Sequence, residues 1–255
     1  ALPICGSAAA ELLCGVGSPS GKLSDTFAKK LEDYPSSETF HESVKYVDYK
    51  EDIYVGYRYF ETIPGADKAV NYPFGYGLSY TTFECALVSA EEKQGVIRVR
   101  VNVTNTGKYP GKEVMQLYAQ APQGVLGKAK RVLAAFEKTR LLAQGETQLL
   151  TLEAPVAQLA SYDDLGKIQK SAYVLEKGKY QFYLGTSVRE TEQVFCFTMP
   201  EDTVTEQLTA KLVTTSLAER MLSDGSFEKL PQSEPNDPDY SAIKRVPREE
   251  SDGFS

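Results

Sequence analysis

The sequence predicts a mainly β protein with a two-sheet sandwich at its centre, between residues 81 and 200. In residues 95–105, Ile97, Val99, Val101 and Val103 alternate with polar side chains. This period of two with one apolar face is typical of a half-buried antiparallel strand. About seven short segments of this kind follow one another between turn residues, a pattern typical of a β-sandwich.

Turn residues separate the other expected strands of the sandwich. They lie at residues 105–107, 110–111, 144–145, 163–164 and 177–178, where Gly, Pro, Asn and Asp favour a reversal of the chain. The strands between them are expected at residues 113–120, 133–141, 147–153, 180–185 and 194–199.

Residues 1–80, which precede the sandwich, are rich in Gly, Pro and Tyr. Residues 8–14 predict one or two helical turns, which end at Gly15 and Gly17. Residues 52–60 are aromatic and β-branched, so we expect an extended, strand-like segment. Residues 72–80 contain too much Gly and Pro for a helix, and we expect a structured loop whose aromatic rings are held by packing.

Residues 201–255, which follow the sandwich, predict a helix and then an extended tail. Thr203 with Glu206 matches a capping box, and a helix of about 18 residues is expected to follow. The apolar stripe of this helix would consist of Val204, Leu208, Leu212, Leu217 and Met221. After Leu230 the sequence shifts to Pro, Ser, Asp, Asn and Glu, which predicts an extended or disordered linker.

Composition excludes several classes of function. No window approaches ~18 uninterrupted apolar residues, so we expect no membrane span. The net charge of −7 would repel a phosphate backbone, so we expect no nucleic-acid partner. His41 is the only histidine, which rules out multi-histidine metal sites and leaves little room for a Ser-His-Asp triad.

The four cysteines form no C-x-x-C pair, which excludes a zinc knuckle or a thioredoxin-type motif. They are Cys5, Cys14, Cys85 and Cys196. Their scatter favours buried free thiols in a reducing compartment, although a Cys85–Cys196 bridge between two expected strands stays open. The first residues, ALPICGSAAA, do not form a signal peptide, and the chain looks as though it starts inside a domain.

One stretch, residues 15–24, suggests a phosphate-binding loop but does not match it. The pattern G-x-x-x-x-G-K-[ST] needs a glycine where Val16 stands and a hydroxyl residue where Leu23 stands. We therefore expect a plain turn between a helix and a strand, with Lys22 solvated or paired.

Four acidic residues lie in the most aromatic stretch of the first 80 residues: Asp48, Glu51, Asp52 and Glu61. Paired carboxylates at ~5–9 Å are the signature of glycoside hydrolysis, but a sequence does not show that separation. A structural ion pair or hydrogen bond is the expected role of each.

Three further residues have both a functional and an ordinary interpretation. Arg58 lies between aromatic residues and could stack on a ring at a pocket edge, but a structural partnership with Glu51 or Asp52 is favoured. His41 is expected to be a surface imidazole. Asn102 begins a glycosylation sequon on the polar face of its strand, and we do not expect it to be used.

Several motifs in order resemble a known family. GSPSGKLSDTF, YKEDIYVGYRYF and YPFGYGLSYTTF resemble the end of the second domain of glycoside hydrolase family three, the β-glucosidase family. VRVNVTNTGKYPGKEVMQLYAQAP, RVLAAFEKTRLLAQGET and GKYQFYLGTSVRE are similar to the fibronectin type III-like domain that follows it. The resemblance covers about residues 6–200. It implies the end of an α/β sandwich domain over residues 1–80, a fibronectin type III-like sandwich over 81–200, and a helix with a linker tail over 201–255.

The resemblance also implies an activity whose catalytic residues lie elsewhere. Family members hydrolyse terminal β-linked glucose, or sometimes xylose or arabinose, with retention and with no metal or organic cofactor. Their nucleophile is an Asp on a TIM-like barrel, and their acid/base is a Glu on the α/β domain upstream of the SPSGKL turn. This chain has neither segment, so no catalytic residue is carried over and the chain alone is expected to be inactive.

The expected partners follow from the same resemblance: the barrel, the rest of the α/β domain, and a β-glucoside or short oligosaccharide in the complete enzyme. Glu51, Asp52, Arg58 and Tyr76 are the candidates for residues that edge the outer substrate subsites, although Glu51 is also interpreted as structural. The tail after the sandwich suggests a permuted domain order with the barrel following it. The unpaired cysteines and acidic charge lean towards a cytoplasmic location.

A different class of function stays open beside this one. The chain could be a stand-alone carbohydrate-binding or protein-interaction module without hydrolase activity, because its 16 Tyr and 11 Phe could form sugar-stacking platforms. The absence of Trp weakens that alternative, and core packing is the commoner use of such residues.

Overall fold

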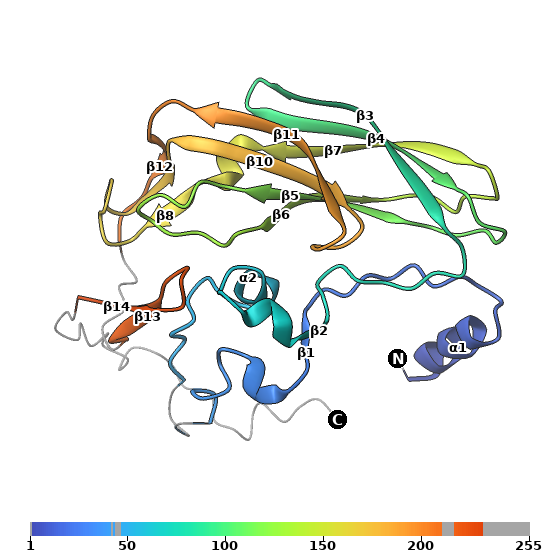
Figure 1. Cartoon of the computed structure of the whole chain (residues 1–255), viewed down its shortest axis with the longest axis horizontal. Helices are drawn as coiled ribbons and strands as arrows, with labels where there is room; N and C mark the ends of the chain where they lie inside the picture. Colours follow the sequence, from blue (N-terminus) through green and yellow to red (C-terminus); the bar gives the residue numbers. More distant parts are fainter. Residues whose placement is uncertain (1, 42, 44–46, 211–216, 232–255) are drawn as a thin grey trace, which may run out of the picture.

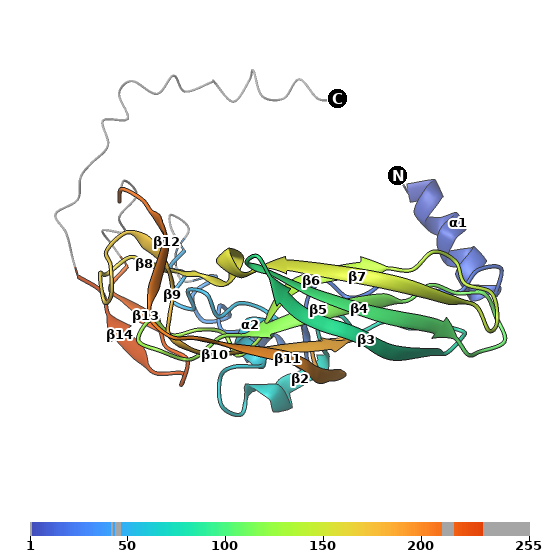
Figure 2. The same cartoon turned by 90° about the horizontal axis from the view of Figure 1, so that it is seen from above.

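A computed structural model of the chain describes residues 2–41, 43, 47–210 and 217–231 (Figure 1). Within these residues the protein is mainly β, as predicted. Two sheets, one of four strands and one of three, pack face to face, and smaller elements lie along one side and one end of this sandwich (Figures 1 and 2).

The three-stranded sheet has the order β3-β4-β7 and the four-stranded sheet the order β11-β10-β5-β6, with every pair antiparallel. The strands are β3 (Phe83–Lys93), β4 (Val96–Asn105), β5 (Val114–Gln120), β6 (Val132–Lys138), β7 (Thr147–Pro155), β10 (Gly178–Gly185) and β11 (Thr191–Met199). The expected strands are thus confirmed, and Cys85 lies on a strand, β3, as expected, although the bounds of that strand were not predicted. The burial of β3 does not alternate regularly, so no period of two marked its ends.

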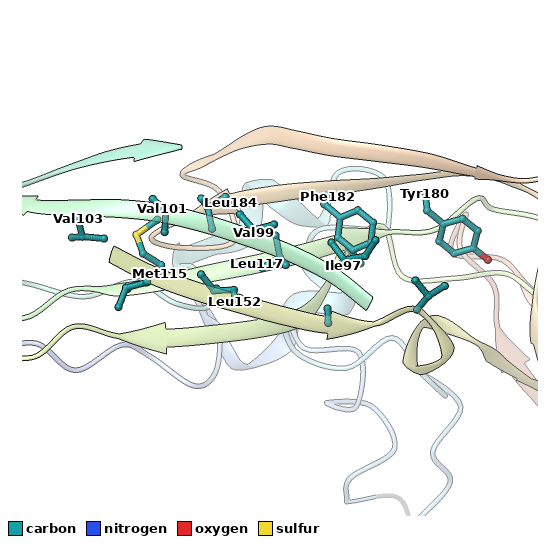
Figure 3. Close-up of a cluster of buried hydrophobic side chains, with 14 of the residues drawn as sticks. Ile97, Val99, Val101, Val103, Met115, Leu117, Leu152, Tyr180, Phe182 and Leu184 are labelled. Atoms are coloured by element: carbon teal, nitrogen blue, oxygen red, sulfur yellow. The ribbon is translucent and has the colours of Figure 1, made fainter. Parts of the chain in front are cut away.

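The core lies between the two sheets (Figure 3). In β4, Ile97, Val99, Val101 and Val103 are fully buried, while the side chains between them face outwards. Leu117 of β5, Leu152 of β7 and Phe182 of β10 face the same interior. The alternation in the sequence therefore corresponds to alternating burial, and the hydrophobic effect holds the two sheets together.

A second small sheet extends one end of the sandwich. It has the order β12-β9-β8, with β8 (Ser161–Asp163), β9 (Ala172–Leu175) and β12 (Thr203–Gln207) all antiparallel. The 3-10 helix η3 (Val156–Leu159) leads into it from β7.

The prediction of a helix from Thr203 to Met221 was wrong for the residues that the structure describes; Leu212 lies outside them. Residues 203–207 form β12, and Glu219–Met221 form β13, which pairs with β14 (Phe227–Lys229) in a hairpin. Thr203 and Val204 are β-branched residues that favour strands, and β9 supplies hydrogen-bond partners for this segment. The linker predicted after Leu230 lies almost entirely outside the described residues.

Residues before the sandwich form short elements beneath it (Figure 1). They are α1 (Leu2–Leu13), β1 (Phe27–Ala28), η1 (Leu31–Asp33), α2 (Tyr57–Phe60), η2 (Ala66–Ala69) and β2 (Val70–Tyr72). The helix expected at residues 8–14 is confirmed within α1. The loop expected at 72–80 is confirmed beyond β2, and the ring of Phe74 lies 4.4 Å from that of Tyr57, centroid to centroid.

The prediction of an extended segment at residues 52–60 was wrong. The backbone turns at Asp52 and Gly56, which have φ angles of 51° and 54°, and then forms the single helical turn α2. Tyr54 and Phe60 are both buried, so these two aromatic residues pack inwards from a compact turn and do not alternate along a strand.

The cysteine prediction was correct in one respect and wrong in another. Cys14, Cys85 and Cys196 are free thiols, and the bridge left open between Cys85 and Cys196 is not formed. All three are exposed, contrary to the expected burial, because β3 is an edge strand and Cys196 faces outwards from β11. The side chain of Cys5 lies outside the described part.

A buried glutamine joins the loop before the sandwich to the sandwich itself. The amide of Gln116 on β5 donates to the carbonyl oxygens of Gly75 at 3.3 Å and of Thr186 at 2.6 Å, and accepts from the hydroxyl of Tyr118. Gly75 has a φ of 80°, and a Cβ there would overlap this amide. A second link confirms that Lys22 is paired, because its Nζ lies 2.8 Å from the Glu113 carboxylate.

Candidate binding pocket

A cavity of about 760 Å³ lies at the end of the sandwich that carries the small sheet. Four segments that are far apart in the sequence line it, within residues 52–58, 119–132, 158–173 and 220–228. The first belongs to the segment before the sandwich, the second joins β5 to β6, the third includes β8 and β9, and the fourth is the β13–β14 hairpin. A cavity of this size is typical of small-molecule sites.

Arg220 of β13 forms the centre of the charges in this pocket. Its guanidinium lies 2.9 Å from Asp164, 2.9 Å from Glu228 and 3.7 Å from Asp52. Glu228 also accepts from Lys167 at 2.9 Å. One guanidinium therefore joins the hairpin, the β8–β9 connection and the segment before the sandwich, a task that suits its planar set of five donors.

The surroundings move the pKa values of these groups in different directions. Burial raises the pKa of Asp52, and the nearby carboxylates of Asp164 and Glu228 add to this, whereas Arg220 opposes it. Burial alone would lower the pKa of Arg220, but the hydrogen bonds and charges of its carboxylate partners raise it above the ordinary value. The guanidinium of Arg220 therefore stays charged at neutral pH.

Asp163 fixes the shape of the β8–β9 connection. Its buried carboxylate accepts four backbone N–H groups, from Gly166 at 2.7 Å, Lys167 at 3.0 Å, Ile168 at 2.6 Å and Gln169 at 2.8 Å. Burial tends to raise the pKa of this carboxyl, but the four donors outweigh burial and the pKa lies below its ordinary value. The carboxylate is thus ionised and structural.

The structure brings together two of the four predicted subsite candidates. Asp52 and Arg58 both line the cavity, and Asp52 pairs with Arg220 instead of with Arg58. Glu51 is buried next to Asp52 but does not line the cavity. Tyr76 lies elsewhere, with its ring 5.2 Å from that of Tyr72 and its carbonyl oxygen accepting from the Leu23 N–H.

Sequence reasoning missed the residues of the hairpin and of the small sheet. Residues 217–221 were assigned to a helix, so Arg220 was not considered. The dipeptide Asp224-Gly225 was the available signal, because Asp-Gly between two short apolar segments favours a hairpin turn. Gly225 has a φ of 85° in the structure.

A smaller cavity of about 480 Å³ lies beside α2, and the charged residues that line it make structural contacts. Glu61 accepts from Arg189 at 2.7 Å, which confirms its expected role in an ion pair. Arg131 lies 4.2 Å over the ring of Tyr183 and donates to the Val188 carbonyl oxygen and to the Thr191 hydroxyl. The exposed His41, as expected at the surface, packs against Phe40.

No group of three or more acidic, histidine or cysteine side chains suited to a metal ion occurs in the described ranges. Across the same ranges, no helix has the length and apolar character needed to cross a membrane.

The fold is an antiparallel two-sheet sandwich of the fibronectin type III-like class. The family model described as the fibronectin type III-like domain matches residues 113–188. The model described as the glycosyl hydrolase family 3 C-terminal domain matches residues 5–80. Both domains occur in the order that the sequence motifs predicted. The chain belongs to glycosyl hydrolase family 3 and corresponds to its C-terminal portion.

Individual relatives agree with this assignment. The chain is 56% identical to β-glucosidase A of Butyrivibrio fibrisolvens over 95% of its length, and 46% identical to a β-glucosidase of Ruminococcus albus over 89%. A solved β-glucosidase structure from Paenibacillus barengoltzii superposes with a TM-score of 0.85 at 46% identity, over 90% of this chain. The chain spans only 31%, 24% and 27% of these three proteins.

Proposed function

We propose that this chain is the non-catalytic C-terminal part of a retaining β-glucosidase, an enzyme that removes terminal β-linked glucose from glucosides or short oligosaccharides. Its role is to support the catalytic domains and to hold residues 49–60 in a fixed position, where Asp52 and Arg58 edge the outer substrate subsites. The barrel and the remainder of the α/β domain are the proposed partners. We also propose that the domain boundaries lie near residues 80 and 200. A barrel domain that follows the tail is part of the same proposal.

The observation that carries this role is that residues 49–60 are held from two sides. On the sandwich side, the ring of Tyr57 packs against Phe74 and its hydroxyl accepts from the Leu133 N–H at 3.0 Å. On the hairpin side, Met221 N–H donates to the Lys50 carbonyl oxygen at 2.7 Å. A loop held in this way is suited to present side chains in one geometry, and catalysis depends strongly on such positioning.

The carboxylates of the pocket are poorly suited to acid/base catalysis by this chain alone. Retaining hydrolysis needs one carboxylate as nucleophile and another as acid/base, about 5–5.5 Å apart. Asp52, Asp164 and Glu228 all surround Arg220, and Asp163 accepts backbone N–H groups. Each carboxylate thus has a structural partner, which supports a positioning role over a catalytic one.

The test is a chimera with the relative from Butyrivibrio fibrisolvens, in which this chain replaces the matching 31% of that protein. We expect the chimera to hydrolyse an aryl β-glucoside and the isolated chain to leave it unchanged. In the chimera, Arg58→Ala should raise the KM for cellobiose about 3–10-fold with a smaller change in kcat, as expected for a binding contact. Arg98→Ala, on the far sheet, is the matched control and should change neither constant.

Two results would contradict the proposal. Turnover by the isolated chain would assign chemistry to residues considered structural here. A chimera that is folded by circular dichroism yet inactive would mean that this chain cannot support the catalytic domains.

A further inference from the structure

Two tyrosines form an exposed aromatic surface at the cavity. Tyr162 of β8 and Tyr173 of β9 are direct cross-strand neighbours, and their ring centroids lie 5.4 Å apart at an interplanar angle of 53°. Both line the cavity, with 41% and 38% of their surfaces exposed. Their neighbours along the strands, Asp163 and Ala172, are buried. Because side chains alternate along a strand, Asp163 and Ala172 face inwards and both tyrosine rings face outwards.

We propose that the Tyr162–Tyr173 pair is a non-catalytic subsite that stacks a pyranose ring of a neutral oligosaccharide. The flat C–H face of a pyranose packs on an aromatic ring, and its hydroxyl groups need donors and acceptors close by. The cavity supplies these from Asp164, Lys167 and Arg220, which lie in the same lining as the two rings. The choice of a sugar over another neutral ligand rests on the proposed function.

The charge of the cavity favours a neutral ligand. Among the described residues that line it, acidic and basic side chains are equal in number, four of each. An anion or a cation would therefore meet no net attraction, whereas a polyhydroxyl ligand can use both kinds of group in charge-assisted hydrogen bonds.

The platform is rigid before any ligand binds. The four N–H groups on Asp163 fix the connection that follows Tyr162, and the Thr205 hydroxyl donates to the Tyr173 carbonyl oxygen at 3.2 Å. Pairing with β12 closes the other side of β9. A preorganised surface loses little conformational entropy on binding, which favours its use as a binding surface.

Stabilisation of the sheet is the ordinary role of a cross-strand tyrosine pair. That role needs only the ring faces that meet each other, whereas here both rings also face an open cavity with polar groups at its walls. The two roles differ in one measurable respect, because only a subsite responds to added sugar.

The experiment is calorimetric titration of the 255-residue chain with cellotetraose. We expect saturable binding at millimolar or lower concentration, weakened at least about tenfold in Tyr162→Thr and Tyr173→Thr. Threonine favours strands, so these variants remove the ring and keep the strand propensity. Tyr109→Ala, at a 62% exposed tyrosine in the connection between β4 and β5, is the matched control and should bind normally.

A second readout needs no variant. In the wild-type chain, the aromatic proton signals of Tyr162 and Tyr173 should shift on titration, while those of Tyr109 stay unchanged. An acidic oligogalacturonate should cause neither heat nor shifts. The proposal is overturned if cellotetraose gives no saturable signal up to about 10 mM, or if shifts and affinity losses occur elsewhere than at this pair. A chimera that hydrolyses the aryl glucoside while this titration fails would overturn the subsite alone, and binding with an inactive chimera would overturn only the proposed function.

Discussion

In the sandwich, β4 places every second side chain in a dry interior, where Val99 and Val101 are fully buried. The hairpin β13–β14, at the end of the molecule, has no such interior. Its attachments include the ion pairs of Arg220, Lys167 and Lys50 and a backbone hydrogen bond to Lys50. The first region is held by apolar area that water cannot reach, and the second by charges that water screens. The same chain therefore joins a scaffold held by apolar packing to a site whose shape depends on polar contacts.

The largest effect is expected in the sandwich core. Phe182→Ala removes a fully buried ring and should lower the free energy of unfolding by about 3–5 kcal/mol, because it leaves a cavity between the sheets. Urea denaturation followed by circular dichroism measures this. Phe136→Ala, at a 65% exposed phenylalanine of β6, should cost no more than about 0.5 kcal/mol. Equal losses in the two variants would mean that the interior between the sheets stabilises the protein no more than its surface does.

The next effect concerns the buried carboxylate between the two regions. Asp163→Ala leaves four backbone donors without their acceptor and should cost about 1.5–3 kcal/mol at neutral pH. The folded-state pKa of Asp163 is below its ordinary value, so its contribution is present above about pH 4 and is lost as the pH falls through the folded pKa. Denaturation at several pH values should show the difference between wild type and variant shrinking in acid. A constant difference would mean that the ionised carboxylate is not its source.

A smaller global effect is expected at Arg220. Its partners are partly exposed, so Arg220→Ala should change the free energy of unfolding by less than about 1 kcal/mol. Amide hydrogen exchange in residues 219–229 should nevertheless accelerate, and the pKa of Asp52 should rise further, because Arg220 is the group that lowers it.

Arg220→Lys separates charge from geometry in the same experiment. The lysine ammonium keeps the charge near Asp52 but lacks the planar set of donors of a guanidinium. Hydrogen exchange in residues 219–229 should therefore be faster than in the wild type and slower than in Arg220→Ala. A loss of global stability as large as that of Phe182→Ala would show that the hairpin belongs to the core.

The smallest effect is expected at an exposed ion pair on the sandwich surface. Arg98 and Glu153 are 2.7 Å apart across β4 and β7, with side chains 40% and 50% exposed. Arg98→Ala should cost no more than about 0.5 kcal/mol, and about 0.5 M salt should remove most of the difference. A loss that persists in salt would mean that the arginine stem, and not its charge, packs on the sheet.

The sequence was informative where burial repeats with a local period. Ile97 to Val103 alternate because their strand has one buried face, so the sandwich followed from the pattern alone. The predictions for residues 52–60, 203–207 and 219–221 were wrong for the same reason: distant partners decide the conformation of these segments. Residues 203–207 form a strand because β9 pairs with them, and residues 52–60 turn because the tyrosines and Phe60 pack inwards.

The candidate site was predictable only in part. Asp52 and Arg58 were identified from their aromatic surroundings, and both line the cavity. Arg220 comes from a hairpin some 160 residues further on, and Tyr162 and Tyr173 meet only because β8 pairs with β9. A local sequence pattern does not show which distant residues come into contact. Asp224-Gly225 nevertheless indicated the turn of the hairpin that carries Arg220.

Gln116 has a consequence for how this protein can be divided. Gln116 is 3% exposed, and its amide lies between Gly75, before the sandwich, and Thr186, within it. A fragment cut at residue 80 would lose the Gly75 partner and uncover the ring of Tyr118, which is fully buried in the intact chain. The loop and the sandwich should therefore melt in a single transition. Recombination that exchanges the sandwich between relatives should succeed only when the loop around Gly75 is exchanged with it.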